Sequence, residues 1–279
     1  MHQNQDLIQS NRFFIIRTFD KYFEIFKISY KNALAYFLEA FSRTIDLTIR
    51  LIIFNQLYIV TYRSQNTSLI NDLARNEVLW ILMFVQSFHL SQVLLRDMIE
   101  NIQSGQITVY LNKPFYFPFF QFAQFMGNEG IKVIMNLILG SILTLLLVGG
   151  FDFNIYHAIY AIPLMVGTLT LGFLQIFIFA LFAFWMEDSS SLFRIYSKID
   201  IVLGGSVFPP ALFPKVLKQI TVLLPFANGA YIVGKTIVKF ERNEYFLALK
   251  LQFLWILLFL CLIVILYRKG TKKLVLQGG

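Results

Sequence analysis

Charged residues are scarce in this chain of 279 residues: they make up 14% of the sequence, whereas hydrophobic residues make up 57%. A soluble domain carries about 25% charged residues, so too few charges remain here to cover a large soluble core. The composition therefore indicates an integral membrane protein. Lys and Arg on cytoplasmic loops account for the net charge of +8, so we expect membrane lipid and not nucleic acid as a partner.

Cysteine and histidine are also rare. The one cysteine, Cys261, lies inside the last apolar run, so no disulfide can form within the chain. The three histidines, His2, His89 and His157, lie far apart, and none has a cysteine or carboxylate at metal-ligand spacing. Neither HExxH nor GxSxG occurs. We therefore expect no catalytic site, metal site or cofactor on this chain.

The first 32 residues predict a cytoplasmic arm with an amphipathic helix. Aromatic and aliphatic residues recur every three or four positions between residues 11 and 31, and Lys and Arg fill much of the other face. A basic, aromatic helix of this kind can lie in the membrane interface. The alternative is a soluble helix packed on a partner, and we favour the interface.

Apolar runs predict an all-α integral membrane fold, in which residues 33–279 form a single domain of six transmembrane helices, because a span needs about 20 apolar residues. The fifth span is short, with Lys198 and Asp200 near its inner end. The expected spans lie within 37–62, 78–95, 133–151, 153–186, 195–208 and 251–267.

The segment 209–247, between the fifth and sixth spans, is too apolar for a free loop and too interrupted by proline for a simple span. It fits a re-entrant helical hairpin or a pair of short interfacial helices. Such backbone is tolerated at membrane depth only where protein covers it or water reaches it.

The first span carries a charged ladder of alternating sign at spacings of three or four residues. Its members are Glu39, Arg43, Asp46 and Arg50. Neighbouring members can form ion pairs on a helix. Since charge inside a membrane is costly unless it is paired or faces protein, we favour a role at the membrane edge or a subunit seam over a substrate contact.

The second span carries a polar stripe on one arc of the helix, formed by Gln86, His89 and Gln92. This arc either lines an aqueous translocation path or makes hydrogen bonds to neighbouring helices, as polar side chains in spans usually do. The sequence leaves both interpretations open.

The distribution of Lys and Arg predicts the topology. Fourteen fall in the arm, in segments 96–132 and 186–198 and in the C-terminal tail, against seven in the segments expected on the other side. Because Lys and Arg accumulate on the cytoplasmic side, we expect both termini and segment 96–118 in the cytoplasm, segment 209–247 outside it, and the chain in the cell membrane.

Residues 229–236, GAYIVGKT, match the phosphate-loop pattern GxxxxGK[ST]. That loop needs a buried strand before it, a helix after it and free backbone amides. Here bulky or apolar residues fill the variable positions, and Pro225 lies just upstream. We interpret the match as coincidental.

Two stretches resemble the permease subunits of ABC-2 type export systems. The first follows the second span and resembles the family's pattern of an Ile, a Gly and an LxxP ending. Its matching positions are Ile102, Gly105, Ile107, Leu111 and Pro114. The second follows the fifth span and resembles the family's G, PxxxFP and LPF region. Its matching positions are Gly205, Pro210, Phe213, Pro214, Leu224, Pro225 and Phe226.

The resemblance implies a permease subunit that forms the path for an exported small molecule or lipid-like substrate. It implies a second permease chain, identical or related, and separate ATP-binding subunits that hold ATP and Mg²⁺. Segment 96–118 would be the coupling segment. Its implied ATPase-coupling residues are Asp97, Glu100, Ile102, Gly105, Leu111 and Pro114.

Two alternatives differ in class from an ATP-driven permease. An ion-driven secondary transporter would require acidic residues and broken helices near the membrane midplane. A membrane scaffold subunit would associate stably with other proteins without any ATPase partner.

Overall fold

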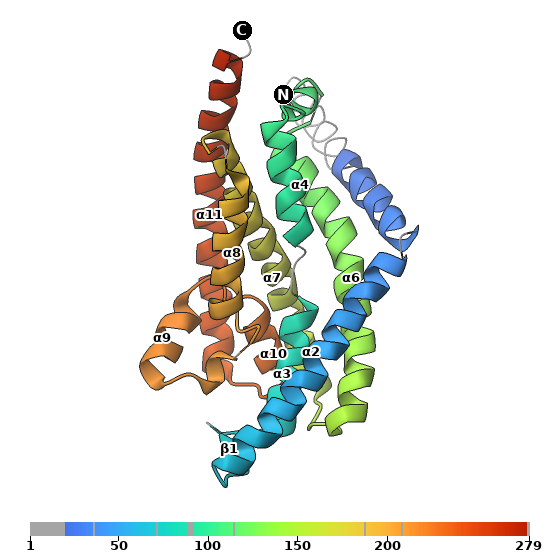
Figure 1. The fold of residues 1–279 in the computed structure, drawn as a ribbon, viewed down its shortest axis with the longest axis vertical. Helices are drawn as coiled ribbons and strands as arrows, with labels where there is room; N and C mark the ends of the chain where they lie inside the picture. The colour runs from blue at the N-terminus through green and yellow to red at the C-terminus, as the bar shows by residue number, and fades with distance from the viewer. Residues whose placement is uncertain are drawn as a thin grey trace, which may run out of the picture.

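The structure is a computed structural model that describes residues 20–277, apart from residues 36, 71, 89–91, 114, 187 and 208. It is a helical bundle with one two-stranded hairpin (Figure 1). Residues 20–35 are helical. The elements that follow are α2 (Phe37–Ser64), β1 (Leu69–Ile70), β2 (Leu73–Ala74), α3 (Arg75–Ser87), α4 (Gln92–Gln103), α5 (Ile107–Leu111), α6 (Phe117–Val148), α7 (Ile155–Leu181), η1 (Phe182–Phe184), α8 (Ser189–Leu203), η2 (Pro210–Leu212), α9 (Lys215–Leu223), α10 (Ala230–Val238) and α11 (Arg242–Gln277).

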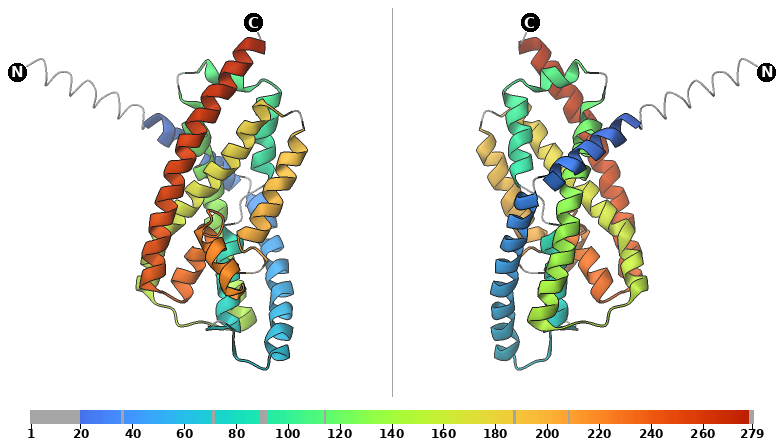
Figure 2. Two further views of the ribbon diagram at one scale, coloured as in Figure 1. Left: turned by 90° about the vertical axis from the view of Figure 1, so that its left-hand side faces the viewer. Right: turned by 90° about the vertical axis from the view of Figure 1, so that its right-hand side faces the viewer.

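The bundle has two ends (Figures 1 and 2). The connection from α4 to α6, the connection from α7 to α8 and the end of α11 lie at one end, which we call the α5 end. The β1–β2 hairpin and the connection from α6 to α7 lie at the other, which we call the hairpin end. The two strands are antiparallel, with Leu69 opposite Ala74.

Four described helices are long and apolar enough to cross a membrane. They cover Phe41–Ser64, Phe117–Val148, Ile155–Phe184 and Arg242–Lys273. Large apolar side chains on α2, α6 and α11 are exposed on the outside of the bundle, as contact with lipid requires. The prediction of an all-α membrane protein is confirmed, whereas length and composition identify four spans in the described residues and not six.

The expected second span, 78–95, is two helices in the structure. α3 ends at Ser87 and α4 begins at Gln92, so neither has the roughly 20 residues that a span needs. α3 is buried from Val78 to Ser87 and packs against α2, α6 and α10. The Ser87 hydroxyl donates to the Met83 carbonyl oxygen at 2.8 Å, a bond that often bends helices. The prediction of one continuous span was therefore wrong.

The third span begins earlier than residue 133. α6 is continuous from Phe117 to Val148, so residues 117–132, which the sequence analysis counted with the loop, are helical. Glu129 and Lys132 lie inside this helix and are 1% and 4% exposed. Glu129 accepts hydrogen bonds from Arg43 of α2 and from Lys132. Because the carboxylate is paired, burial within a span is tolerated.

The segment 209–247 contains two short helices, α9 and α10. α10 is buried from Tyr231 to Val238 and packs against α3 and α7, whereas α9 exposes apolar side chains such as Val216. The last residues of the segment already belong to α11, which begins at Arg242. α8, with 15 residues, is also shorter than an ordinary span.

Side chains of α11 satisfy the backbone of the turn between α9 and α10. Gln252 Nε2 donates to the Asn228 carbonyl oxygen at 2.7 Å, and Trp255 Nε1 donates to the Leu223 carbonyl oxygen at 2.9 Å. The Asn228 side chain itself donates to the Leu224 carbonyl oxygen at 3.2 Å. The irregular backbone is thereby paired inside the protein, which is the condition for placing it at membrane depth.

The described part of the arm is helical, as predicted for its residues 20–31, while residues 11–19 lie outside the described residues. Helix 20–35 crosses α6 at Gly127. A Cβ atom at this glycine would lie 2.5 Å from the Phe26 carbonyl oxygen and 2.8 Å from Ser29 Cβ. The absence of a side chain therefore allows the two helices to touch.

Replacing Gly127 with Leu is expected to displace helix 20–35, because overpacking a close contact costs about 1–3 kcal/mol. Limited trypsin digestion at Lys21, Lys27 and Lys31 measures the displacement as faster cleavage. Gly130→Leu is the matched control, since no atom lies within 4 Å of a Cβ atom built there. Equal cleavage rates in the two variants would contradict the contact.

Candidate functional site

Helix α4 has an apolar face toward the core and a polar face toward the outside. The apolar face consists of Leu95, Met98, Ile99 and Ile102, which are 0–3% exposed. Asp97 and Glu100 are exposed on the other face. Of the expected coupling residues on this helix, these two carboxylates are accessible to a partner, whereas Ile102 anchors the helix to α7 and its neighbours.

Gly105 forms the turn between α4 and α5. Its φ of 75° lies in the left-handed region that favours glycine, and its N–H donates to the Ile102 carbonyl oxygen at 3.2 Å. The hydroxyl of Thr108 donates to the Gly105 carbonyl oxygen at 2.7 Å. Leu111 is the last residue of α5. Its side chain, and all of Pro114, lie outside the described residues.

Hydrogen bonds connect the α5 end to the start of α8 and to α11. Gln103 Nε2 at the end of α4 donates to the Met186 carbonyl oxygen at 3.1 Å. Lys273 Nζ of α11 donates to the Phe184 carbonyl oxygen at 3.0 Å. Three segments far apart in sequence therefore meet at this end.

The arm joins the same end through an aromatic contact. The Tyr116 N–H donates to the Tyr22 hydroxyl at 2.9 Å, and the Tyr116 and Tyr267 rings meet edge to face. Burial raises the pKa of the Tyr116 phenol, and the nearby Arg268 guanidinium partly offsets this. The phenol is therefore neutral at physiological pH.

The charged ladder is divided between two environments. Arg50 pairs with Asp46 at 2.8 Å on an exposed surface, as the spacing predicted. Arg43 instead donates to both carboxylate oxygens of Glu129, at 2.8 and 3.3 Å. Glu39 lies on α2, but its side chain is outside the described residues. The Arg43–Glu129 bond joins α2 to α6, so this part of the ladder lies at a seam between helices of one chain.

Removing the Glu129 carboxylate with Glu129→Gln is expected to destabilise the chain by about 3–5 kcal/mol, because the change leaves buried cations uncompensated. Thermal unfolding in detergent, followed by size-exclusion chromatography, measures the loss. Glu24→Gln is the matched control, since the exposed Glu24–Lys27 pair lies outside the candidate spans and an exposed pair contributes about 0–1 kcal/mol. Similar losses in both variants would show that the Arg43–Glu129–Lys132 group has no special role.

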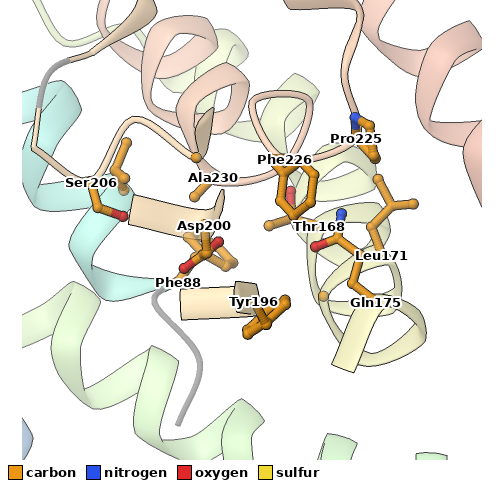
Figure 3. Close-up of a pocket in the computed structure, with 14 residues that line it drawn as sticks. Phe88, Thr168, Leu171, Gln175, Tyr196, Asp200, Ser206, Pro225, Phe226 and Ala230 are labelled. Atoms are coloured by element: carbon orange, nitrogen blue, oxygen red, sulfur yellow. The ribbon is translucent and has the colours of Figure 1, made fainter. Parts of the chain in front are cut away.

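A cavity of about 50 Å³, which we call the central cavity, lies where α7, α8 and the turn 225–230 meet (Figure 3). A buried site needs about 10–15 Å³ to hold one water molecule. The cavity therefore has room for a few waters or for one small chemical group.

The lining of the central cavity combines polar groups with aromatic rings. The polar side chains are Thr168 and Gln175 of α7, Asp200 of α8 and Ser206. The rings are those of Phe88, Tyr196 and Phe226. Gln175 is 6% exposed, and its Nε2 has no hydrogen-bond partner among the described residues. Gln175 carries no distinguishing signal in the sequence, because it lies in a long run without charge.

One residue of the predicted polar stripe, Gln86, lies beside this cavity. Gln86 is buried, and its Nε2 donates to the Ser206 carbonyl oxygen at 2.6 Å, so it bonds to the cavity wall. Its neighbours Val85 and Phe88 line the cavity. His89 lies outside the described residues, as does the side chain of Gln92. Gln86 thus makes the hydrogen bond to a neighbouring element that was one of the two interpretations.

Residues 229–236 have none of the geometry of a phosphate loop. Residues 230–236 belong to the buried helix α10, whereas a phosphate loop links a strand to a helix. Lys235 Nζ is paired with Glu241 at 3.1 Å and with Glu244 of α11. Within the part of the chain that the structure describes, no three His, Cys, Asp or Glu side chains are grouped to hold a metal ion.

Long apolar helices, an apolar exterior and paired buried charges define a multi-pass membrane protein. A profile of the family described as ABC-2 family transporter protein matches residues 44–278. The chain belongs to this family and is a membrane subunit of an ABC-type transporter, which confirms the resemblance seen in the sequence. A search of curated proteins found no match.

Proposed function

We propose that this chain forms the translocation path of an ATP-driven exporter for a small molecule or a lipid-like substrate. A separate ATP-binding subunit, which holds ATP and Mg²⁺, docks on the α5 end, and a second permease chain completes the path. The observation that carries this proposal is the two-faced helix α4: its carboxylates are exposed on one face, and its opposite, apolar face is buried in the core.

The α5 end supports a docking role because it is both polar and anchored. Asp97 and Glu100 project from a helix whose other face is packed in the core, so force applied to them moves the whole helix. The bond from Gln103 to the Met186 carbonyl oxygen links α4 to the segment that leads into α8. Both termini and this end face the cytoplasm in the proposed topology, in the cell membrane.

The path is proposed to include the central cavity and the stripe formed by Gln86, His89 and Gln92. α7 and α8 both reach from the α5 end to this cavity. ATP binding closes the ATPase pair and tilts α4, and the helices then switch between inward-facing and outward-facing arrangements, a rigid-body change of a known kind.

Reversing two exposed charges with Asp97→Arg and Glu100→Arg is expected to weaken docking of the ATP-binding subunit by about tenfold or more, since like charges placed against each other cost several kcal/mol. The amount of ATP-binding subunit that co-purifies with the tagged chain in mild detergent, quantified by mass spectrometry, measures docking.

Asp152→Arg is the matched control, because Asp152 is exposed in the connection at the hairpin end. Docking that is unchanged in the double variant, with normal membrane insertion, would refute the coupling assignment. A chain that purifies without any ATP-binding protein would favour a membrane scaffold subunit, and transport driven by an ion gradient would favour a secondary transporter.

A further inference from the structure

We propose that the outer side of α2 is the surface on which a second, identical copy of this chain docks, with Asp46 and Arg50 of the two copies paired across it. This inference rests on the proposed function, which includes a second permease chain, and it identifies that chain and the surface that binds it. We call this surface the α2 seam. Its members are Asp46, Arg50, Ile53, Leu57 and Val60.

The α2 seam is a line of side chains that no described element of the chain covers. Its members follow one another at spacings of four, three, four and three residues. Residues at these spacings lie along one side of a helix, as contact residues do where two helices pack in parallel. Arg50 is partly exposed and the other four are exposed. Figure 2 shows α2, in blue, at the edge of the bundle.

The charged pair of the α2 seam lies within a membrane-spanning segment. The candidate span covers Phe41–Ser64, which is about 36 Å of helix, whereas the hydrocarbon core of a bilayer is about 30 Å thick. Arg50 lies about 14 Å from the start of this span and about 21 Å from its end. It therefore lies at hydrocarbon depth, where ionised side chains almost always face protein or a water-filled cavity.

The bond within α2 leaves hydrogen-bonding groups of the pair unused. Arg50 Nε donates to Asp46 Oδ2 at 2.8 Å, and the two Nη groups of Arg50 make no hydrogen bond to the described residues. The Arg50 and Asp46 side chains remain 43% and 61% exposed. An ion pair removed from water is favourable only if additional hydrogen bonds satisfy its remaining groups. Lipid tails offer none, so protein is the expected neighbour.

A second copy supplies the missing partners because the pair is self-complementary. In a two-fold symmetric interface, every contact from residue i to residue j is repeated from j to i. Two copies inserted with the same topology have parallel α2 helices, with equivalent residues at equal depth. The Nη groups of Arg50 in each copy can then donate to the Asp46 carboxylate of the other. Two acids and two bases form a closed neutral group, without an unrelated subunit that matches the charges by chance.

The opposite side of α2 is fixed to its own chain, so the α2 seam is held in a defined orientation. Arg43 donates to Glu129 of α6, and the Thr44 hydroxyl donates to Asn136 Oδ1 of the same helix at 3.0 Å. These polar groups face α6, whereas Asp46 and Arg50 lie on an exposed surface. The outward charges are therefore not needed to hold α2 in the bundle.

Charge reversal tests the pairing between copies. Two copies that carry different affinity tags are co-expressed, extracted in mild detergent and purified through one tag, and the second tag is quantified. Asp46→Arg in both copies, or Arg50→Asp in both copies, is expected to reduce co-purification by about tenfold or more, because like charges then face each other. Pairing is expected to recover when one copy carries Asp46→Arg and the other carries Arg50→Asp.

The mixed pair separates a contact between copies from a folding defect. Each of its chains still lacks its internal ion pair, so damage to the single chain would persist, whereas opposite charges again face each other across the α2 seam. Glu24→Arg is the matched control. It reverses one member of an exposed ion pair outside the candidate spans and is expected to leave co-purification unchanged.

Disulfide cross-linking locates the contact. Cys261, which is exposed, is first replaced by Ala, and Ile53→Cys is then introduced. Oxidation in native membranes is expected to give a cross-linked dimer, because residues across a two-fold axis can bring their Cβ atoms within the roughly 4 Å that a disulfide needs. Ile142→Cys is the matched control, since Ile142 is similarly exposed but belongs to α6.

Three results would overturn the proposal: undiminished pairing in each single variant, no recovery in the mixed pair, or no more cross-linking at Ile53→Cys than at Ile142→Cys. Each would leave lipid or a different subunit as the neighbour of α2. Neither measurement uses an ATP-binding subunit. Copies can therefore pair while ATPase docking is absent, or fail to pair while docking is observed, so the two proposals are tested separately.

Discussion

Two short helices, α3 and α10, end inside the bundle, and the need to pair their exposed backbone groups constrains the rest of the structure. Hydrocarbon offers no hydrogen bonds, so irregular backbone at membrane depth must be enclosed by protein or reached by water. α10 approaches α3 closely at Gly234, where a Cβ atom would lie 3.0 Å from the Ile81 carbonyl oxygen. α11 supplies Gln252 and Trp255 to the adjacent turn. The long helices thus enclose the short ones and also satisfy their backbone.

This constraint divides the core into two apolar clusters. One joins α2, α3 and α10 toward the hairpin end, and the other joins α4, α8 and α11 toward the α5 end, with α7 contributing to both. The central cavity lies near the end of α3, where Phe88 meets residues of α7 and α8. Beside the cavity, the Gln86 side chain of α3 donates to the carbonyl oxygen of the loop residue Ser206.

Helices that consist of one long apolar run were predicted from the sequence. Contacts between segments far apart in the chain were not. Long apolar runs predicted α2, α7 and the middle of α11, because each is a long segment with a clear composition. Hydropathy cannot distinguish one span from two short helices, and residues 78–95 were therefore misinterpreted. Glu129 and Lys132 resembled loop residues because their partner Arg43 is 86 residues away from Glu129 in sequence. The available signal was that Glu129 and Lys132 lie three residues apart in an otherwise uncharged run, which indicates a paired charge within a helix.

The same limit applies to the candidate site. Gly105 was singled out only by the resemblance to the family pattern, and the structure supplies the local reason for glycine, a turn with positive φ. Ile102 was expected in the coupling segment from the resemblance alone, and its burial, which makes it an anchor, depends on contacts with distant helices. Asp200 was seen only as a charge near the end of a short span. Its place in a cavity depends on α7 and on the turn 225–230, neither of which local sequence can position.

The arrangement of α8 connects the two parts of the proposed mechanism. α8 begins at Ser189, shortly after Met186, whose carbonyl oxygen accepts from Gln103 of α4. Asp200 lies eleven residues after Ser189 on the same helix, about 17 Å along its axis. Because packed interiors have low compressibility and transmit strain, we expect a displacement of α4 at the α5 end to be transmitted to α8. In the proposed cycle, the docking surface thereby changes the geometry of the central cavity, which α8 lines.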